Sequence, residues 1–199
     1  SAVYDIYKIA TIIDGDEINL ELYQCKKNNE EQIRLKLYHA KTPLELSDVL
    51  PIMENMGLDV ITELPSEVSP AKFKHKVWVH DFLIRPANKD EEVNFKKTKK
   101  PFEDVFKKTW DKDMESDSLN QLSLYAAMDW RDITILRAYT HYLRQTTFPI
   151  SLPSMETALT THPDIAKKLV TFFKTMHDPS NNKLSDKQKQ KHIDDIFAS

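Results

Sequence analysis

Two stretches of the amino-terminal third alternate apolar and polar residues with the period of a β-strand. In residues 18–23 and 33–38, Ile or Leu at every second position alternates with Asn, Glu, Arg, Lys or Tyr. A period of two places all the apolar side chains on one face of a sheet. The segment between the two runs, Lys26 to Glu31, is polar and contains Asn28-Asn29. We therefore predict that the two runs form a β-hairpin.

The rest of the first half predicts a mixture of strands and helices. Its elements are a strand over residues 3–13, a helix from Thr42 to Met56, a strand from Leu58 that ends before Pro65, a strand from Lys76 to Ile84, and a charged loop from Ala87 to Lys100. From Ile33 onward, the order strand, helix, strand, strand, helix is that of a ferredoxin-like α+β unit. Its closing strand is not evident, so we expect the first residues of the chain to supply it.

From Pro101 onward the pattern is helical, with breaks at later prolines. The longest helical signal runs from Asn120 to Gln145. Asp129 interrupts it, and Asp129 with Asp132 three residues later is typical of the first turn of a new helix. We predict two helices that meet near Met128, within an all-helical segment over residues 101–199 that follows an α+β module over residues 1–100.

The second of these helices has two contrasting sides. One side has the spacing of a face packed against a core, with Ile133, Leu136, Tyr139, Thr140 and Leu143 at steps of three and four. The other side carries a basic row, Arg137, His141 and Arg144, at positions i, i+4 and i+7. We expect the row to pair with carboxylates of this protein or of an adjacent domain, because a guanidinium binds a carboxylate through two hydrogen bonds. The alternative is an anionic ligand.

Composition excludes several classes of function. The 199 residues contain only two glycines, Gly15 and Gly57. The sequence therefore contains neither the glycine-rich fingerprint of a dinucleotide-binding fold nor a Walker phosphate-binding loop. The net charge of −3 argues against a general nucleic-acid partner. A lone Cys25 provides no disulfide framework, and the acidic residues from Asp111 to Asp117 lack the spacing of a calcium loop. We expect no metal site in this segment.

No pattern in the sequence indicates a membrane-spanning segment or a secretory signal peptide. No apolar run approaches the roughly 20 residues that span a bilayer. The amino terminus lacks the basic-then-apolar order of a signal peptide. We expect a cytoplasmic protein without a membrane partner.

Several motifs, in order, resemble the large-subunit bacterial NAD-specific glutamate dehydrogenases. They are Leu46-Ser47-Asp48-Val49-Leu50-Pro51, Glu54-Asn55-Met56-Gly57-Leu58, Val77-Trp78-Val79-His80-Asp81-Phe82, Trp130-Arg131-Asp132, Leu136-Arg137-Ala138-Tyr139 and Tyr142-Leu143-Arg144-Gln145. Asp132 stands where the family usually has Glu, and Ala127 where it usually has Gly. The complete chains of the family are many times longer than this one.

The resemblance implies an excised piece of the long amino-terminal region, with an ACT-like module followed by helical motifs. Family activity is the NAD-dependent oxidation of L-glutamate to 2-oxoglutarate, a step in amino acid catabolism. It implies no catalytic or cofactor-binding residue in this segment, NAD being bound elsewhere in the parent enzyme. It also implies partners among the other domains of that enzyme and a homo-oligomeric parent.

The resulting hypothesis is a non-catalytic regulatory or assembly segment, inactive by itself. Two alternatives stay open. One is an ACT-like module that senses an amino acid, although the loop from His39 to Pro43 lacks the glycine that such sites often carry. The other is a helical protein-protein adaptor unrelated to any enzyme.

Overall fold

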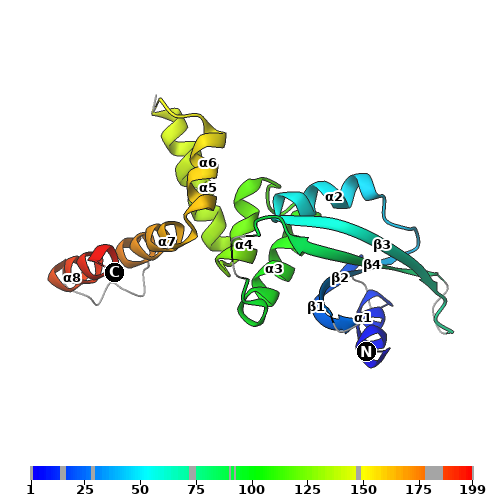
Figure 1. Cartoon of the computed structure of the whole chain (residues 1–199). Coiled ribbons are helices and arrows are strands. Elements are labelled where there is room, and N and C mark those ends of the chain that lie inside the picture. The colour runs from blue at the N-terminus through cyan, green and yellow to red at the C-terminus, as the bar shows by residue number, and fades with distance from the viewer. Residues whose placement is uncertain are drawn as a thin grey trace.

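The computed structural model describes residues 2–13, 17–27, 30–71, 75–89, 91, 93–146, 149–177 and 186–198. Its elements, in chain order, are α1 (Ala2–Ile13), β1 (Ile18–Lys27), β2 (Glu30–Ala40), α2 (Leu46–Asn55), β3 (Leu58–Val68), β4 (Val77–Pro86), α3 (Phe95–Trp110), the 3-10 turn η1 (Ser118–Gln121), α4 (Leu122–Tyr125), α5 (Trp130–Gln145), α6 (Leu152–Thr161), α7 (Pro163–His177) and α8 (Asp186–Ala198). Figure 1 shows the sheet at one end of the molecule and α5 to α8 extending away from it. Helices α1 and α8, the first and last elements, lie far apart in this view.

The four strands form one antiparallel sheet with the order β1-β2-β4-β3. The predicted hairpin is confirmed, with Leu20 opposite Leu37 and Leu22 opposite Leu35. The series β2, α2, β3, β4, α3 follows the ferredoxin-like order, and β1 lies beside β2 where the closing strand of that fold belongs. The fold class is therefore α+β, an ACT-like module followed by a helical segment.

The main core lies between the sheet and the helices α2 and α3. The strands contribute the residues that the alternation predicted, and the helices contribute large apolar side chains that include Val49, Met53, Phe102, Val105 and Phe106. The same cluster continues without a break into η1, α4 and α5 through Leu119, Leu122, Leu124, Ile133 and Leu136. One core thus joins the sheet to the first helices of the second half.

The prediction of a strand over residues 3–13 is wrong, because these residues form helix α1. Ile9 and Ile12 are buried against Tyr38 and neighbouring β4 residues, on the sheet face opposite the main core. One turn earlier, Asp5 accepts hydrogen bonds from Lys36 Nζ at 2.8 Å and from Tyr38 Oη at 2.5 Å. The steps from Asp5 to Ile9 and Ile12 are helical, and packing on that face outweighs the strand-like composition.

Three boundaries also differ from the prediction. Helix α2 begins at Leu46 rather than Thr42, and the Leu44 N–H just before it donates to His80 Nε2 at 3.1 Å. Strand β3 continues through Pro65 to Val68; it is an edge strand, where a missing N–H is tolerated. The charged loop ends at Asn94, whose side chain accepts from the Lys97 N–H and caps α3.

The predicted break at Asp129 is confirmed. The Asp129 side chain accepts the Asp132 N–H at 2.9 Å and caps α5. Before it, the chain forms only the short turns η1 and α4, and Ala127 has a φ of 50°. No helix in the described part of the chain is long and apolar enough to cross a membrane.

Candidate functional site at the junction of the two modules

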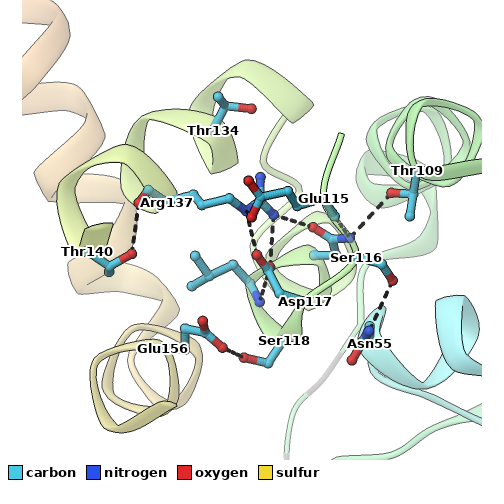
Figure 2. Close-up of polar contacts among 12 residues, drawn as sticks. Asn55, Thr109, Glu115, Ser116, Asp117, Ser118, Thr134, Arg137, Thr140 and Glu156 are labelled. Atoms are coloured by element: carbon cyan, nitrogen blue, oxygen red, sulfur yellow. Dashed lines mark hydrogen bonds and ion pairs between the residues drawn. The ribbon is translucent and has the colours of Figure 1, made fainter. Parts of the chain in front are cut away.

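Arg137, the first member of the predicted basic row, lies inside the junction between the sheet and the helices. Only 6% of the residue is exposed. Its guanidinium donates to both carboxylate oxygens of Asp117, from Nε to Oδ2 at 2.5 Å and from Nη2 to Oδ1 at 2.8 Å. Nη2 also donates to Asn120 Oδ1 at 2.7 Å. Figure 2 shows the Arg137 side chain extending toward Asp117. A forked pair of this kind is among the strongest polar contacts that a protein makes.

Asn120 extends the network from α5 to α3. It is completely buried, and its Nδ2 donates to Thr109 Oγ1 at 3.3 Å and to the Glu115 carbonyl at 3.0 Å. Asp117 has a further task, since its Oδ1 accepts the Leu119 N–H at 3.1 Å and caps η1. The buried polar groups are therefore paired, which burial requires.

Two outer contacts connect the same segment to α2 and α6. Asn55 Nδ2 donates to Ser116 Oγ at 3.0 Å, and Ser118 Oγ donates to Glu156 Oε2 at 2.7 Å (Figure 2). Residues 115–120, which we call the hub, thus reach four helices: α2, α3, α5 and α6. The hub fixes the orientation of the helical segment relative to the ACT-like module.

Gly57 forms a second connection between the modules. Its carbonyl accepts from Tyr125 Oη and from the Ala87 N–H, each at 2.9 Å, and the Asn88 N–H donates to the same Tyr125 oxygen at 3.0 Å. Burial raises the pKa of Tyr125. Gly57 has a φ of 77°, and a Cβ there would lie 2.6 Å from Tyr125 Cε2. Only glycine fits this contact without displacement.

The structure separates the three members of the predicted basic row. Arg137 is buried and paired within the chain, whereas His141 and Arg144 are exposed on the last turns of α5. Within the described residues, neither His141 nor Arg144 forms an ion pair. Whether these two contact another domain or an anion remains a prediction.

The loop that an amino-acid sensor would use is occupied by internal contacts. Lys41 has a φ of 74°, the conformation that glycine favours, although no glycine is present. The Lys41 N–H donates to the Lys76 carbonyl at 2.9 Å, and the Leu44 N–H donates to His80. His80 is 2% exposed, and its Nδ1 lies 2.5 Å from Glu63 Oε1.

Sequence reasoning missed the partners of Arg137. Asp117 was considered only within an acidic stretch, and Asn120 only as the start of a helical signal. The available signal was local, because an Asp before Ser-Leu-Asn is typical of the residue that caps a helical turn. No local pattern indicates that Thr109, eleven residues before Asn120, bonds to it.

The fold and this junction define the class: an ACT-type module joined to a helical motif through a shared core and buried hydrogen bonds. Residues 17–98 match the family model described as glutamate dehydrogenase, ACT3 domain, and residues 114–179 match glutamate dehydrogenase, helical motif 3.

Curated relatives agree with both matches. The chain is 37% identical to the NAD-specific glutamate dehydrogenase of Halomonas elongata over 180 residues, which is 90% of this chain and 11% of the relative. Identity is 38% over 174 residues with the Pseudomonas aeruginosa enzyme and 27% over 175 residues with that of Mycobacterium tuberculosis, again over 11% of each relative. The chain belongs to the NAD-specific glutamate dehydrogenase family and spans about a tenth of the length of these relatives.

Proposed function

We propose that this chain is a non-catalytic segment of an NAD-dependent glutamate dehydrogenase and that it serves assembly and regulation. The parent reaction converts L-glutamate, NAD and water to 2-oxoglutarate, ammonium and NADH. The partners are then the other domains of the same enzyme. The two family matches and the small share of the relatives that the chain covers support this proposal.

The hub is the observation that carries an assembly role. Arg137 forms hydrogen bonds to Asp117 and to Asn120, so these polar groups already position helices within the chain. A buried ion pair of this kind fixes one arrangement of its neighbours, because breaking it would leave an unpaired buried charge. The ACT-like sheet and the helical motif thus form one block to which other domains can attach.

The alternative of an amino-acid sensor requires free backbone donors in the loop after β2. The N–H groups of Lys41, Thr42 and Leu44 already donate to Lys76, Ala40 and His80 respectively. An amino-acid carboxylate would have to displace these bonds. The assembly role is therefore the better supported proposal.

The test is a pair of measurements on the purified chain, with the full dehydrogenase as the positive control. We expect the chain to give the circular dichroism of a folded α+β protein and no glutamate-dependent reduction of NAD. Turnover by the chain alone would contradict the proposal. Calorimetric titration with a panel of amino acids distinguishes the assembly role from the amino-acid sensor, since saturable binding to the chain would favour the sensor.

A further inference from the structure

Helices α5, α6 and α7 enclose an apolar groove on the side of α5 away from Arg137. Its volume is about 350 Å³, and its lining is apolar apart from two hydroxyl groups. The lining residues are Ile135, Leu136, Tyr139, Thr140, Leu143, Met155, Ala158, Leu159, Leu169 and Phe172. All three helices lie within the segment that matches helical motif 3.

The lining is unsuited to a polar metabolite. Of its two hydroxyl groups, that of Thr140 already donates to the Arg137 carbonyl at 2.9 Å. Sites for small ligands orient them with several convergent polar groups, and here only the Tyr139 hydroxyl is available. Glutamate or a nucleotide would lose its hydration without replacement. Apolar side chains suit the groove better.

Large apolar side chains continue from the groove onto the surface. Leu143 and Leu169 in the lining are 37% and 38% exposed. Beyond them, Tyr142, Ile165 and Met176 are 61%, 48% and 40% exposed. Each of these three residues lies three or four positions from a lining residue of the same helix. Scattered apolar residues are ordinary, but exposed apolar residues at helical spacing from the lining of a groove indicate an interaction surface.

A second copy of the same groove is a poor occupant. In a twofold dimer the same patch meets itself, so two concave surfaces would face each other and leave a void. Packing requires a convex partner. The relatives offer one source, because nearly nine-tenths of their length lies outside the region that matches this chain.

We propose that the groove binds an amphipathic helix from another part of the same dehydrogenase polypeptide, with apolar residues at i, i+3 or i+4, and i+7 pointing into it. This inference rests on the proposed assembly function and names its docking surface. A helix of that pattern presents a narrow convex row, which is how helices enter apolar grooves in other recognition systems.

Site-specific photo-cross-linking in the full dehydrogenase tests the proposal. A benzophenone amino acid replaces Leu169 in the groove, with Lys167 as the matched control. Lys167 is exposed on the same helix, and two residues along a helix place it on the opposite side. We expect the Leu169 probe to link to a helix outside the region of this chain, at about ten times the yield of the Lys167 probe or more.

Two other outcomes would overturn the proposal in distinguishable ways. Links from Leu169 to the equivalent groove of another subunit would show that a second copy of the chain occupies the groove. A Leu169 yield equal to that of Lys167 would exclude the groove. In that case a probe at Ile6, which is 67% exposed on α1, tests the proposed function separately. Links from Ile6 to residues outside this chain would support the assembly role. The absence of such links would contradict the assembly role as well as the groove.

A charge in the groove provides an independent check. Leu169→Asp in the full dehydrogenase should lower its activity about tenfold or more, whereas Lys167→Asp should change it less than twofold. The 199-residue chain with Leu169→Asp should keep its circular dichroism, since Leu169 is partly exposed. A folded Leu169→Asp chain whose parent enzyme keeps full activity would contradict the proposal.

Discussion

The two sides of α5 differ in how completely the chain satisfies them. On one side, Arg137 is buried and forms hydrogen bonds to Asp117 and Asn120. On the other, Tyr139 and Leu143 line a groove that the described residues leave open. Arg137 is paired within the chain, whereas the described residues do not fill the groove.

This difference separates structural residues from those available for interaction. A basic row on a helix suggests a binding surface, but its most buried member is already paired. The apolar spacing suggests a core face, but two of its members, Tyr139 and Leu143, are 43% and 37% exposed. Contact with other domains is therefore expected on the apolar side of α5, with His141 and Arg144 as additional candidates.

The largest effect is expected from Asp117→Ala. It leaves the buried Arg137 guanidinium with Asn120 and the more distant, exposed Glu115, whose Oε2 lies 3.9 Å from Nε. We expect a loss of about 3 kcal/mol in the free energy of unfolding. Urea unfolding followed by tryptophan fluorescence measures this. Asp113→Ala is the control, because Asp113 forms an exposed pair with Lys108 that should contribute less than about 1 kcal/mol.

The double variant Asp117→Leu/Arg137→Met sharpens the same test. Replacing both partners by apolar groups removes the unpaired charge, so this variant should be more stable than Asp117→Ala. If Asp117→Ala costs no more than Asp113→Ala, the hub does not hold the two modules together.

Gly57→Ala should have the next largest effect. The new Cβ would lie 2.6 Å from Tyr125 Cε2 at a φ of 77°. Backbone strain and displacement of Tyr125 together should cost about 2 kcal/mol. Thermal unfolding by circular dichroism measures the loss. A midpoint equal to that of the unchanged chain would show that the second connection is loose.

Ala127→Gly should be mildly stabilising. Ala127 holds a φ of 50°, which is unfavourable for a residue with a Cβ. Relief of that strain outweighs the added freedom of the unfolded chain, so we expect a gain of about 0.5 kcal/mol. Ala138→Gly, at an exposed position within α5, is the control and should cost about 1 kcal/mol. A loss at both positions would contradict this reading of the turn.

The smallest effect concerns Glu103 of α3. Burial raises its pKa above 4.5, although the Leu22 N–H donates to its Oε1 at 2.9 Å. The folded state therefore binds the proton more tightly, and the stability contributed by this group rises as pH falls from the folded pKa toward 4.5. Glu103→Gln should be more stable than the parent at neutral pH. Urea unfolding across this pH range should show that advantage shrinking on acidification.

The sequence was most informative where a pattern and its packing are local. The period of two in residues 18–23 and 33–38 predicted β1, β2 and their pairing, and Asp129 predicted the start of α5. The prediction for residues 3–13 was wrong because their composition is typical of a strand. The helical spacing of Ile9 and Ile12, which pack against β2 and β4, was overlooked. Contacts between residues far apart in the sequence determined that this segment is a helix.

The junction was harder to predict than the fold. The basic row was visible, but the partners of Arg137 lie 17 and 20 residues earlier, in a turn that follows α3. Gly57 directly follows the helix predicted from Thr42 to Met56, and its contact with Tyr125 joins residues 68 positions apart. Such pairings depend on how whole elements pack, which periodicity does not reveal.

Amide hydrogen exchange tests the central claim most directly. The exchange of residues 1–199 is measured in the isolated chain and again within the full dehydrogenase. We predict that amides of α7 and of the second half of α5 slow about tenfold or more in the enzyme, while those of the hub, already protected, stay unchanged. Slowing confined to the hub, with the groove helices unaffected, would contradict the account.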